Sequence, residues 1–368
     1  MELIDKIMNS KKLPYIQLVD LFTPYLKRYD LKAEKEVTIF IDYFDLLNQL
    51  YNGENLDEIS SIKYSDRLTI ASHVINMISH YRHFFFSRLG IYTNFYIYAS
   101  FKKDDDILAF NPEYKKEFYT KRLNLKDQTY GVMNSISLNT LKIVRTFLSY
   151  VPHAYLINTM NKDYSVLPYY IIHNKDNPNN LLNIIISNEE VYYQDTLDDK
   201  TIILDNRVQR SKIITKENLY DILLDKSKTV NPEELTILPE LYTAIEPLVA
   251  NKKIGLKSVK RMGYAKAIKY IQNKVNNNEI SNIEYSNPDT VLECLNDLNN
   301  EEKEIYKMNM KSINHKYLSS IYDYSPIVES QIVDRFDPEG IRKTNEIYFA
   351  KNPVLLDFLF DGEEYVMK

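Results

Sequence analysis

Three carboxylates stand at or just beyond the ends of short apolar segments in this sequence. Asp42 closes TIFID, Asp163 lies in NKDY after a later apolar segment, and Glu189 follows NIIIS. Carboxylates that end separate parallel strands meet at one edge of a sheet, where their oxygens suit Mg²⁺ or Mn²⁺. Asp42 and Glu189 also stand where a helix cap is expected, ahead of helices from about Phe44 and beyond Glu189. Metal binding and helix capping both stay open for this edge.

Apolar segments and the helical patterns between them would position these carboxylates. The pattern predicts strands over residues 37–41, 94–99, 154–157, 183–187 and 201–204. A helix is predicted after Ser65-Asp66, because apolar side chains recur at three- and four-residue spacing from Ile70 to Phe85. Another helix is predicted over 138–150, and from Thr215 the chain becomes helical. This alternation predicts a parallel α/β sheet, with ligand chemistry beyond the carboxyl ends of the strands.

The composition is that of a globular protein with an acidic balance. The 368 residues carry a net charge of −5 and are 44% hydrophobic, which suits one large domain or two ordinary ones. No apolar stretch approaches the roughly 20 residues of a membrane span, and MELIDKIMNSKK holds no segment of signal-peptide length. The single cysteine, Cys294, excludes an internal disulfide and a multi-cysteine metal site, and we expect it to be buried. We therefore expect a cytoplasmic protein that does not contact membranes.

Six segments in order, from about residue 37 to 275, resemble the flap endonuclease and 5′–3′ exonuclease family. That family has a strand ending in Asp before a Leu-rich helix, a Y-P-E-Y-K signature, two acidic segments after strands, and a helix ahead of a helix-three-turn-helix motif. The matching segments here are TIFIDYFDLLNQLY, NPEYK, NTMNKDYSVLPYY, SNEEVYYQ, ITKENLYDILL and LVANKKIGLKSVKRMGYAKA. The resemblance implies a PIN-like α/β core with a parallel sheet, a helical arch and a helix-three-turn-helix motif.

The resemblance also implies a two-metal nuclease site, and most of its ligand positions have lost their carboxylate here. Asp42, Asp163 and Glu189 are kept, as the metal ligands and catalytic residues of any remaining site. The other positions of the family's ligands fall at Ala99, Asn161, Tyr164, Val191, Asn251 and Ile254. Two cations about 4 Å apart need a crowd of carboxylates, and valine and isoleucine coordinate none. We expect impaired nuclease activity, with Mg²⁺ or Mn²⁺ at one weak site at most.

A basic segment carries the second implied activity, which is DNA binding. From Asn251 to Lys274 the chain holds eight Lys and Arg and no acid. In the family this glycine turn lets main-chain N–H groups and lysines contact the phosphates of duplex DNA without reading its sequence. The residues carried over are Lys257, Lys260, Arg261, Gly263 and Lys266. The alternative is a solvated basic helix face.

A second basic cluster follows the NPEYK segment, where the family has its helical arch. Lys115, Lys116, Lys121 and Arg122 are interleaved with aromatic side chains, a pattern that suits a threaded single strand. The acidic run 104–106 beside it argues against a purely nucleic-acid role.

We expect four regions along the chain. They are an N-terminal extension (1–36), a nuclease-type core (37–214), a helical region with the DNA-binding motif (215–290) and a C-terminal extension (291–368) that offers a surface for a protein partner. Thirty-one tyrosines, no tryptophan and abundant Asn, Ile and Lys are typical of an AT-rich genome, which favours a phage protein of the host cytoplasm or the virion.

Three functions follow from these patterns. The first is a flap-endonuclease-like pseudoenzyme that binds duplex or branched DNA as a DNA-binding or assembly factor. The second is an active Mg²⁺-dependent 5′ nuclease with a rearranged site. The third is a structural component of a virion or larger complex.

Overall fold

A six-stranded sheet in the order β3-β2-β1-β4-β5-β6 forms the centre of the molecule. The computed structural model describes residues 36–45, 64–100, 104–115, 140–175, 177–205, 212–227, 241–252, 254–276, 288–332 and 338–349. Strands β1 to β5 pair in parallel, and β6 pairs antiparallel with β5. Their bounds are Glu36–Asp42, Tyr92–Ala99, Ala154–Asn158, Asn180–Ile186, Thr201–Asp205 and Lys212–Ile214. The fold is α/β with a mostly parallel sheet, as the sequence predicted.

Both faces of the central strand β1 are covered, which explains its unbroken apolar sequence. Val37 and Ile39 on one face and Phe40 on the other have no exposed surface, as expected for a parallel sheet packed on both sides. The sequence missed β6, because three residues carry no periodicity and this strand exists only through its pairing with β5.

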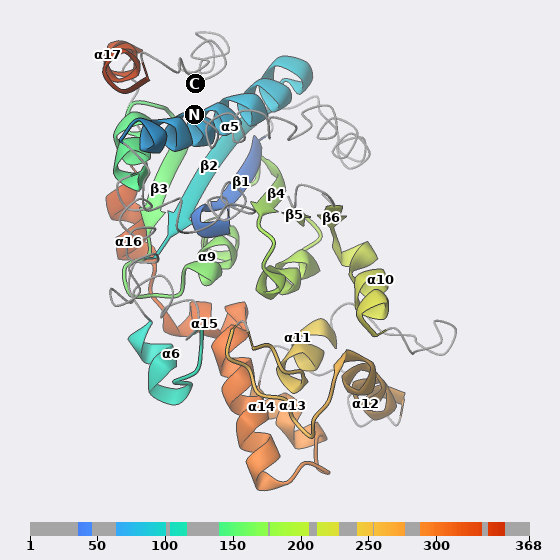
Figure 1. Ribbon diagram of the computed structural model, residues 1–368. Coiled ribbons are helices and arrows are strands. Elements are labelled where there is room, and N and C mark those ends of the chain that lie inside the picture. The colour runs from blue at the N-terminus through green and yellow to red at the C-terminus, as the bar shows by residue number, and fades with distance from the viewer. Residues whose placement is uncertain are drawn as a thin grey trace.

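Helices surround the sheet, and many of them gather beneath the carboxyl ends of its strands (Figure 1). Helix α5 (Tyr64–Leu89) contacts β2. Its Val74, Ile78 and Phe85 are buried, as the three- and four-residue spacing predicted. Residues 140–148 form a helix within the predicted range 138–150, of which 138 and 139 lie outside the described residues. The short helices at the strand ends are α6 (Asp105–Phe110), η1 (Tyr164–Val166), α9 (Leu167–Asn174) and η2 (Glu190–Leu197).

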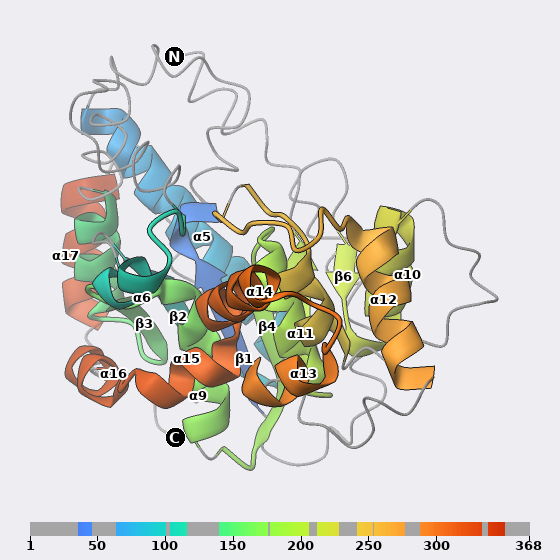
Figure 2. The same cartoon turned by 90° about the horizontal axis from the view of Figure 1, so that it is seen from below.

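The chain after the sheet is helical. Figure 2, seen from below, shows α10 (Lys216–Ser227) beside α12 (Tyr264–Asn276). The remaining helices are α11 (Tyr242–Ile245), η5 (Glu246–Leu248), α13 (Pro288–Cys294), α14 (Asn300–Ile313), α15 (His315–Ile321), α16 (Ser325–Gln331) and α17 (Pro338–Phe349). No helix within the described ranges is long and apolar enough to cross a membrane.

All six strands lie between residues 36 and 214, but the boundaries expected for the four regions stay a prediction. Most of the N-terminal extension and the tail after residue 349 lie outside the described residues.

The basic segment is held against the NPEYK segment by a close contact of main chains. Gly255 has a φ of +78°, and a Cβ there would lie 1.9 Å from the carbonyl oxygen of Glu113. Beside it the N–H of Lys115 donates to the carbonyl of Ile254 at 3.1 Å. Only glycine permits both the left-handed conformation and this approach. The contact fixes the main chain of Lys115 relative to the basic turn.

We predict that Gly255→Ala destabilises the protein far more than Gly90→Ala. Gly90 also has a positive φ, of +66°, but apart from its chain neighbours no atom lies within 4 Å of the point where a Cβ would stand. Gly90→Ala should therefore cost only the left-handed strain, roughly 1–2 kcal/mol, whereas Gly255→Ala must also separate two main-chain segments. Urea unfolding of both variants measures the difference, and equal losses would contradict the close contact.

Candidate functional site

The carboxyl ends of β1, β3 and β4 bring the three predicted carboxylates to one edge of the sheet. Asp42 ends β1, and Asp163 and Glu189 stand at the N-cap positions of the short helices η1 and η2 that follow β3 and β4. Of these two, Asp163 caps its helix by accepting from a main-chain N–H, whereas the Glu189 side chain makes no cap hydrogen bond. Asp42 and Asp163 are each 1% exposed, and Glu189 is half-buried. All three therefore stand at or just beyond strand ends, and their role as metal ligands and catalytic residues stays a prediction.

Asp42 is bound by protein donors on both of its oxygens. Its Oδ1 accepts from the main-chain N–H groups of Phe44 (3.0 Å) and Asp45 (3.2 Å), so it caps the helical turn that follows. Its Oδ2 accepts from the Tyr192 hydroxyl at 3.2 Å. The neighbouring Asp45 accepts from the Ser187 hydroxyl and from a main-chain N–H after β4. Helix capping, the alternative interpretation of Asp42, is what the structure shows.

Asp163 is neutralised by a lysine. The Nζ of Lys115 lies 3.0 Å from both carboxylate oxygens, and Lys115 is only 5% exposed. Hydroxyls of Tyr114 and Ser165, both at 2.6 Å, and the N–H of Ser165 at 2.8 Å complete the shell. Burial alone would raise the pKa of Asp163, but the Lys115 charge and these hydrogen bonds hold it below its usual value.

A second buried carboxylate, Asp104, joins this group from the start of α6. It accepts from the main-chain N–H groups of Asp163 (2.8 Å) and Ile107 (3.0 Å) and from the Tyr322 hydroxyl (2.6 Å). Burial raises the pKa of Asp104 to about 6, against the lowering effect of these hydrogen bonds. The Tyr324 hydroxyl donates to the carbonyl of Asp163 at 2.7 Å. The linker between α15 and α16, which carries Tyr322 and Tyr324, therefore packs on the edge of the sheet where these carboxylates lie.

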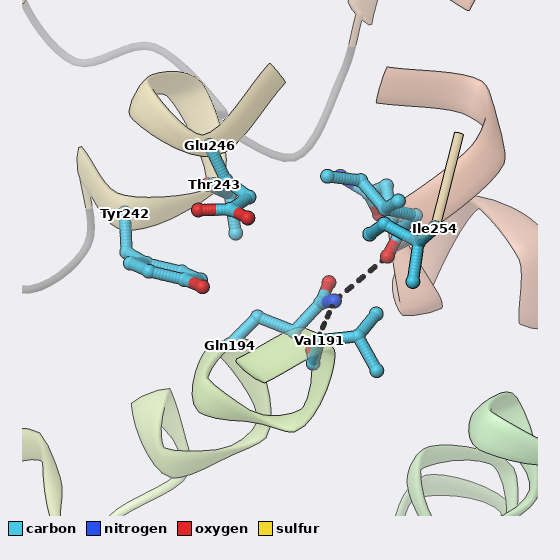
Figure 3. Close-up of a pocket in the computed structure, with 8 residues that line it drawn as sticks. Val191, Gln194, Tyr242, Thr243, Glu246 and Ile254 are labelled. Carbon is cyan, nitrogen blue, oxygen red and sulfur yellow. Dashed lines mark hydrogen bonds between the residues drawn. The ribbon is translucent and has the colours of Figure 1, made fainter. Parts of the chain in front are cut away.

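Two positions where the family resemblance expects acids line one small cavity between η2 and the start of the basic segment (Figure 3). Val191 and Ile254 are each 5% exposed. In Figure 3 they lie beside Gln194, with Tyr242 and Thr243 across from them. The Gln194 amide donates to the carbonyls of Val191 (2.8 Å) and Ile313 (2.7 Å). The cavity of about 10 Å³ holds one water at most. Glu246 also lines it, so the acid here comes from η5 and not from the positions of Val191 and Ile254.

The donor set does not fit a pair of divalent cations as it stands. Within the described ranges, no three His, Cys, Asp or Glu side chains are grouped so that they could hold one ion. Glu190, the residue next to Val191, accepts from the Tyr264 hydroxyl at 3.4 Å. The edge is a hydrogen-bonded network in which a lysine supplies the counter-charge.

The basic turn presents its cations to solvent on a firmly held main chain. Lys257, Lys260, Arg261, Gly263 and Lys266 are all exposed. The turn changes direction at Lys260 and Arg261, where φ is +49° and +54°. The side-chain amide of Asn309, on α14, fixes the main chain of the turn by donating to the carbonyls of Pro247 (2.8 Å) and Lys257 (2.6 Å).

Helix α12 continues the exposed basic surface. Ala267, Ile268 and Ile271 are buried, whereas Lys266 and Lys269 are exposed. This segregation places the positive charges on the solvent side of an amphipathic helix. The geometry is compatible with phosphate contacts along the turn and the first part of α12.

The predicted arch cluster is described only at its first residue. Lys115 is buried on Asp163 and is not an exposed strand-binding cation, because the approach at Gly255 and the Asp163 charge place it inside. Lys116, Lys121 and Arg122 lie outside the described residues. Cys294 is buried, as expected.

Sequence reasoning missed the C-terminal half of the site. Tyr322 and Asp104 are 218 positions apart, and no spacing rule links them. It also missed the buried pair formed by His315 Nδ1 and Asp195, 2.8 Å apart, which packs α15 onto η2. The acidic run 104–106 was visible in the sequence, but not the fact that only its first member turns inward.

Solved structures place this architecture among known proteins. The chain is similar to the bacteriophage T5 D15 protein co-crystallised with metal ions, with 12% identity and a TM-score of 0.51 over 86% of this chain and 100% of that one. It is equally similar, with 12% identity and a TM-score of 0.51 over 85% and 100% of the two chains, to the T5 D15 flap endonuclease in a pseudo-enzyme–product complex with DNA and metal ions. The chain has a flap endonuclease-like fold.

At this identity the likeness concerns the fold alone. No protein-family model matches the chain, and no curated protein sequence matches it either. The resemblance drawn from six sequence segments is therefore confirmed as a fold, and the state of its site rests on the residues themselves.

We predict that Lys115→Met destabilises the protein by roughly 3–5 kcal/mol, because it leaves the buried Asp163 carboxylate without its cation. Lys115→Met combined with Asp163→Asn should cost much less than the sum of the single changes, since the double variant buries no net charge. Chemical unfolding of the three variants gives the coupling free energy. Additive losses would show that Lys115 and Asp163 do not interact.

We predict that Asp104 adds to the free energy of unfolding at low pH and not at neutral pH, which is the opposite of a salt-bridged acid. Its pKa is about 6 in the fold against an ordinary 3.8, so the folded state holds the proton more tightly. The resulting stability is fully present below about pH 4 and is lost as pH rises through 6, by at most ~1.4 kcal/mol per pH unit. The difference in unfolding free energy between wild type and Asp104→Asn, followed from pH 4 to 7, isolates this carboxyl. A flat difference would contradict the raised pKa.

Proposed function

We propose that this protein is a flap-endonuclease-like DNA-binding protein whose nuclease activity is lost or severely reduced. The observation that carries the proposal is the Lys115 ammonium seated 3.0 Å from both oxygens of Asp163. Asp42 is likewise engaged by two main-chain N–H groups and Tyr192. A metal ligand needs free lone pairs, and these carboxylates direct theirs at protein donors.

Charge supports the same proposal. A divalent cation beside Asp163 would lie next to the Lys115 ammonium and be repelled by it, in a buried site where screening by water is weak. Val191 and Ile254, at two positions where the resemblance expects acids, have side chains without lone pairs. Recovering a two-metal site would require Lys115 to leave a position where Asp163, Tyr114 and Tyr164 contact it.

DNA binding is supported by the exposed turn and by the structural likeness. The T5 D15 flap endonuclease to which this chain is similar was solved with DNA. Here the segment from Asn251 to Asn276, which carries the exposed cations of the turn and α12, contains no Asp or Glu. Such a surface binds backbone phosphates of duplex or branched DNA without reading sequence. The proposed role is that of a DNA-binding or assembly factor, encoded by a phage.

We predict salt-sensitive binding to duplex and 5′-flap DNA, measured by fluorescence anisotropy at several salt concentrations. Reversing Lys257, Arg261 and Lys266 to Glu should weaken binding at least tenfold and flatten the salt dependence by about 0.9 in logarithmic slope for each lost phosphate contact. Reversing the exposed Lys142 and Arg145, on the 140–148 helix, serves as the control. Binding that is insensitive to salt, or equally weakened in both variants, would refute the proposed role of the turn.

We predict that the protein does not cleave a labelled 5′ flap at an appreciable rate in Mg²⁺ or Mn²⁺ under conditions where it binds that DNA. Cleavage that requires the metal and disappears in Asp42→Ala would instead establish an active nuclease with a rearranged site. Asp105→Ala, which changes an exposed acid of α6, is the matched control for that comparison.

A further inference from the structure

One carboxylate interrupts the positive surface of the basic segment. Asp297, in the loop between α13 and α14, accepts from Lys260 Nζ at 3.0 Å, and the Tyr270 hydroxyl donates to its other oxygen at 2.7 Å. Lys274 Nζ lies 3.1 Å from that second oxygen. Lys260 also donates to the main-chain carbonyl of Asp297 at 2.9 Å. Two ammonium groups and a phenol thus converge on one anion.

The three donors form a built site and are not independent surface contacts. The Lys260 and Lys274 ammoniums lie 5.8 and 5.9 Å from the centre of the Tyr270 ring, which positions both. The Lys274 side chain is only 13% exposed, and that of Lys260 is 32% exposed. The donors hold the pKa of Asp297 below its usual value, outweighing its partial burial, so the occupant is a carboxylate anion at neutral pH.

Asp297 is more exposed than the two lysines that hold it. The Asp297 side chain is 48% exposed, and the site opens to solvent on its side. A phosphodiester carries the same charge of −1 and two oxygens that accept charge-assisted hydrogen bonds. Lys260 belongs to the same turn as Arg261 and Lys257, so a strand that contacts the turn passes the Asp297 carboxylate.

We infer that Lys260, Lys274 and the Tyr270 hydroxyl form a phosphate site at the edge of the basic turn, and that Asp297 occupies this site until a DNA phosphate displaces it. This inference rests on the proposed DNA binding. Asp297 is the residue that limits the affinity for DNA. Asp297 both competes for the donors and repels an approaching phosphate. Its removal frees the site for one more backbone contact.

The experiment compares Asp297→Asn with Glu293→Gln in the full-length protein. Both substitutions remove one negative charge, and Glu293 is an exposed acid of α13, close in the chain to Asp297. Binding of fluorescein-labelled duplex DNA is measured by anisotropy from low to high salt. We expect Asp297→Asn to bind up to about fivefold more tightly than Glu293→Gln, with a logarithmic salt slope steeper by about 0.9. Adding Lys274→Met to Asp297→Asn should remove the gain.

The outcomes separate this inference from the proposed function. Equal affinity and slope for Asp297→Asn and Glu293→Gln, with salt-sensitive binding intact in the wild type, overturn the phosphate site alone. Binding in none of the proteins overturns both. Thermal unfolding checks that Asp297→Asn is folded, and Asp297→Ser, a smaller neutral variant of the same position, must show the same gain.

Discussion

The ion pair between Lys115 and Asp163 lies where the strand ends, the basic turn and the C-terminal helices meet. A buried carboxylate at this edge is stable only with a counter-charge, because the loss of hydration is not otherwise offset. In a two-metal nuclease that counter-charge is supplied by divalent cations. Here the chain supplies it with an ammonium group, 3.0 Å from both oxygens. Three other buried carboxylates nearby, Asp42, Asp45 and Asp104, each accept from protein hydroxyls and main-chain N–H groups.

Placing a lysine in that position depends on contacts from two other parts of the chain. The close approach at Gly255 fixes the main chain of Lys115. Tyr322 and Tyr324 close the opposite side by donating to Asp104 and to the carbonyl of Asp163. The C-terminal residues therefore belong to the site physically, although the sequence suggested only a surface for a partner there.

The carboxylates at the sheet edge and the cations of the basic turn differ in burial and in pairing. At the sheet edge a cation of the chain satisfies carboxylates inside the protein. At the turn and along α12, most of the described cations are exposed, and Lys260 and Lys274 are held by an acid, Asp297. Burial explains the difference, since an inward charge must be paired whereas an outward charge is solvated. This distribution is the basis of the proposed function, in which the exposed cations hold DNA and the paired carboxylates no longer bind metal.

Much of this protein was determined by its sequence alone. Strands β1 to β5, the α5 pattern and the places of Asp42, Asp163 and Glu189 after strands follow from periodicity and from the order of elements, because both are local properties of the chain. The sequence also shows that Val191 and Ile254, at positions where the resemblance expects acids, have side chains that cannot coordinate a metal. Only the tertiary structure decided what each remaining carboxylate binds. Lys115 and Asp163 are 48 positions apart, and Asp104 and Tyr322 are 218 apart. No helical or strand period relates residues at such distances, so their contacts exist only once the sheet has brought its carboxyl ends together.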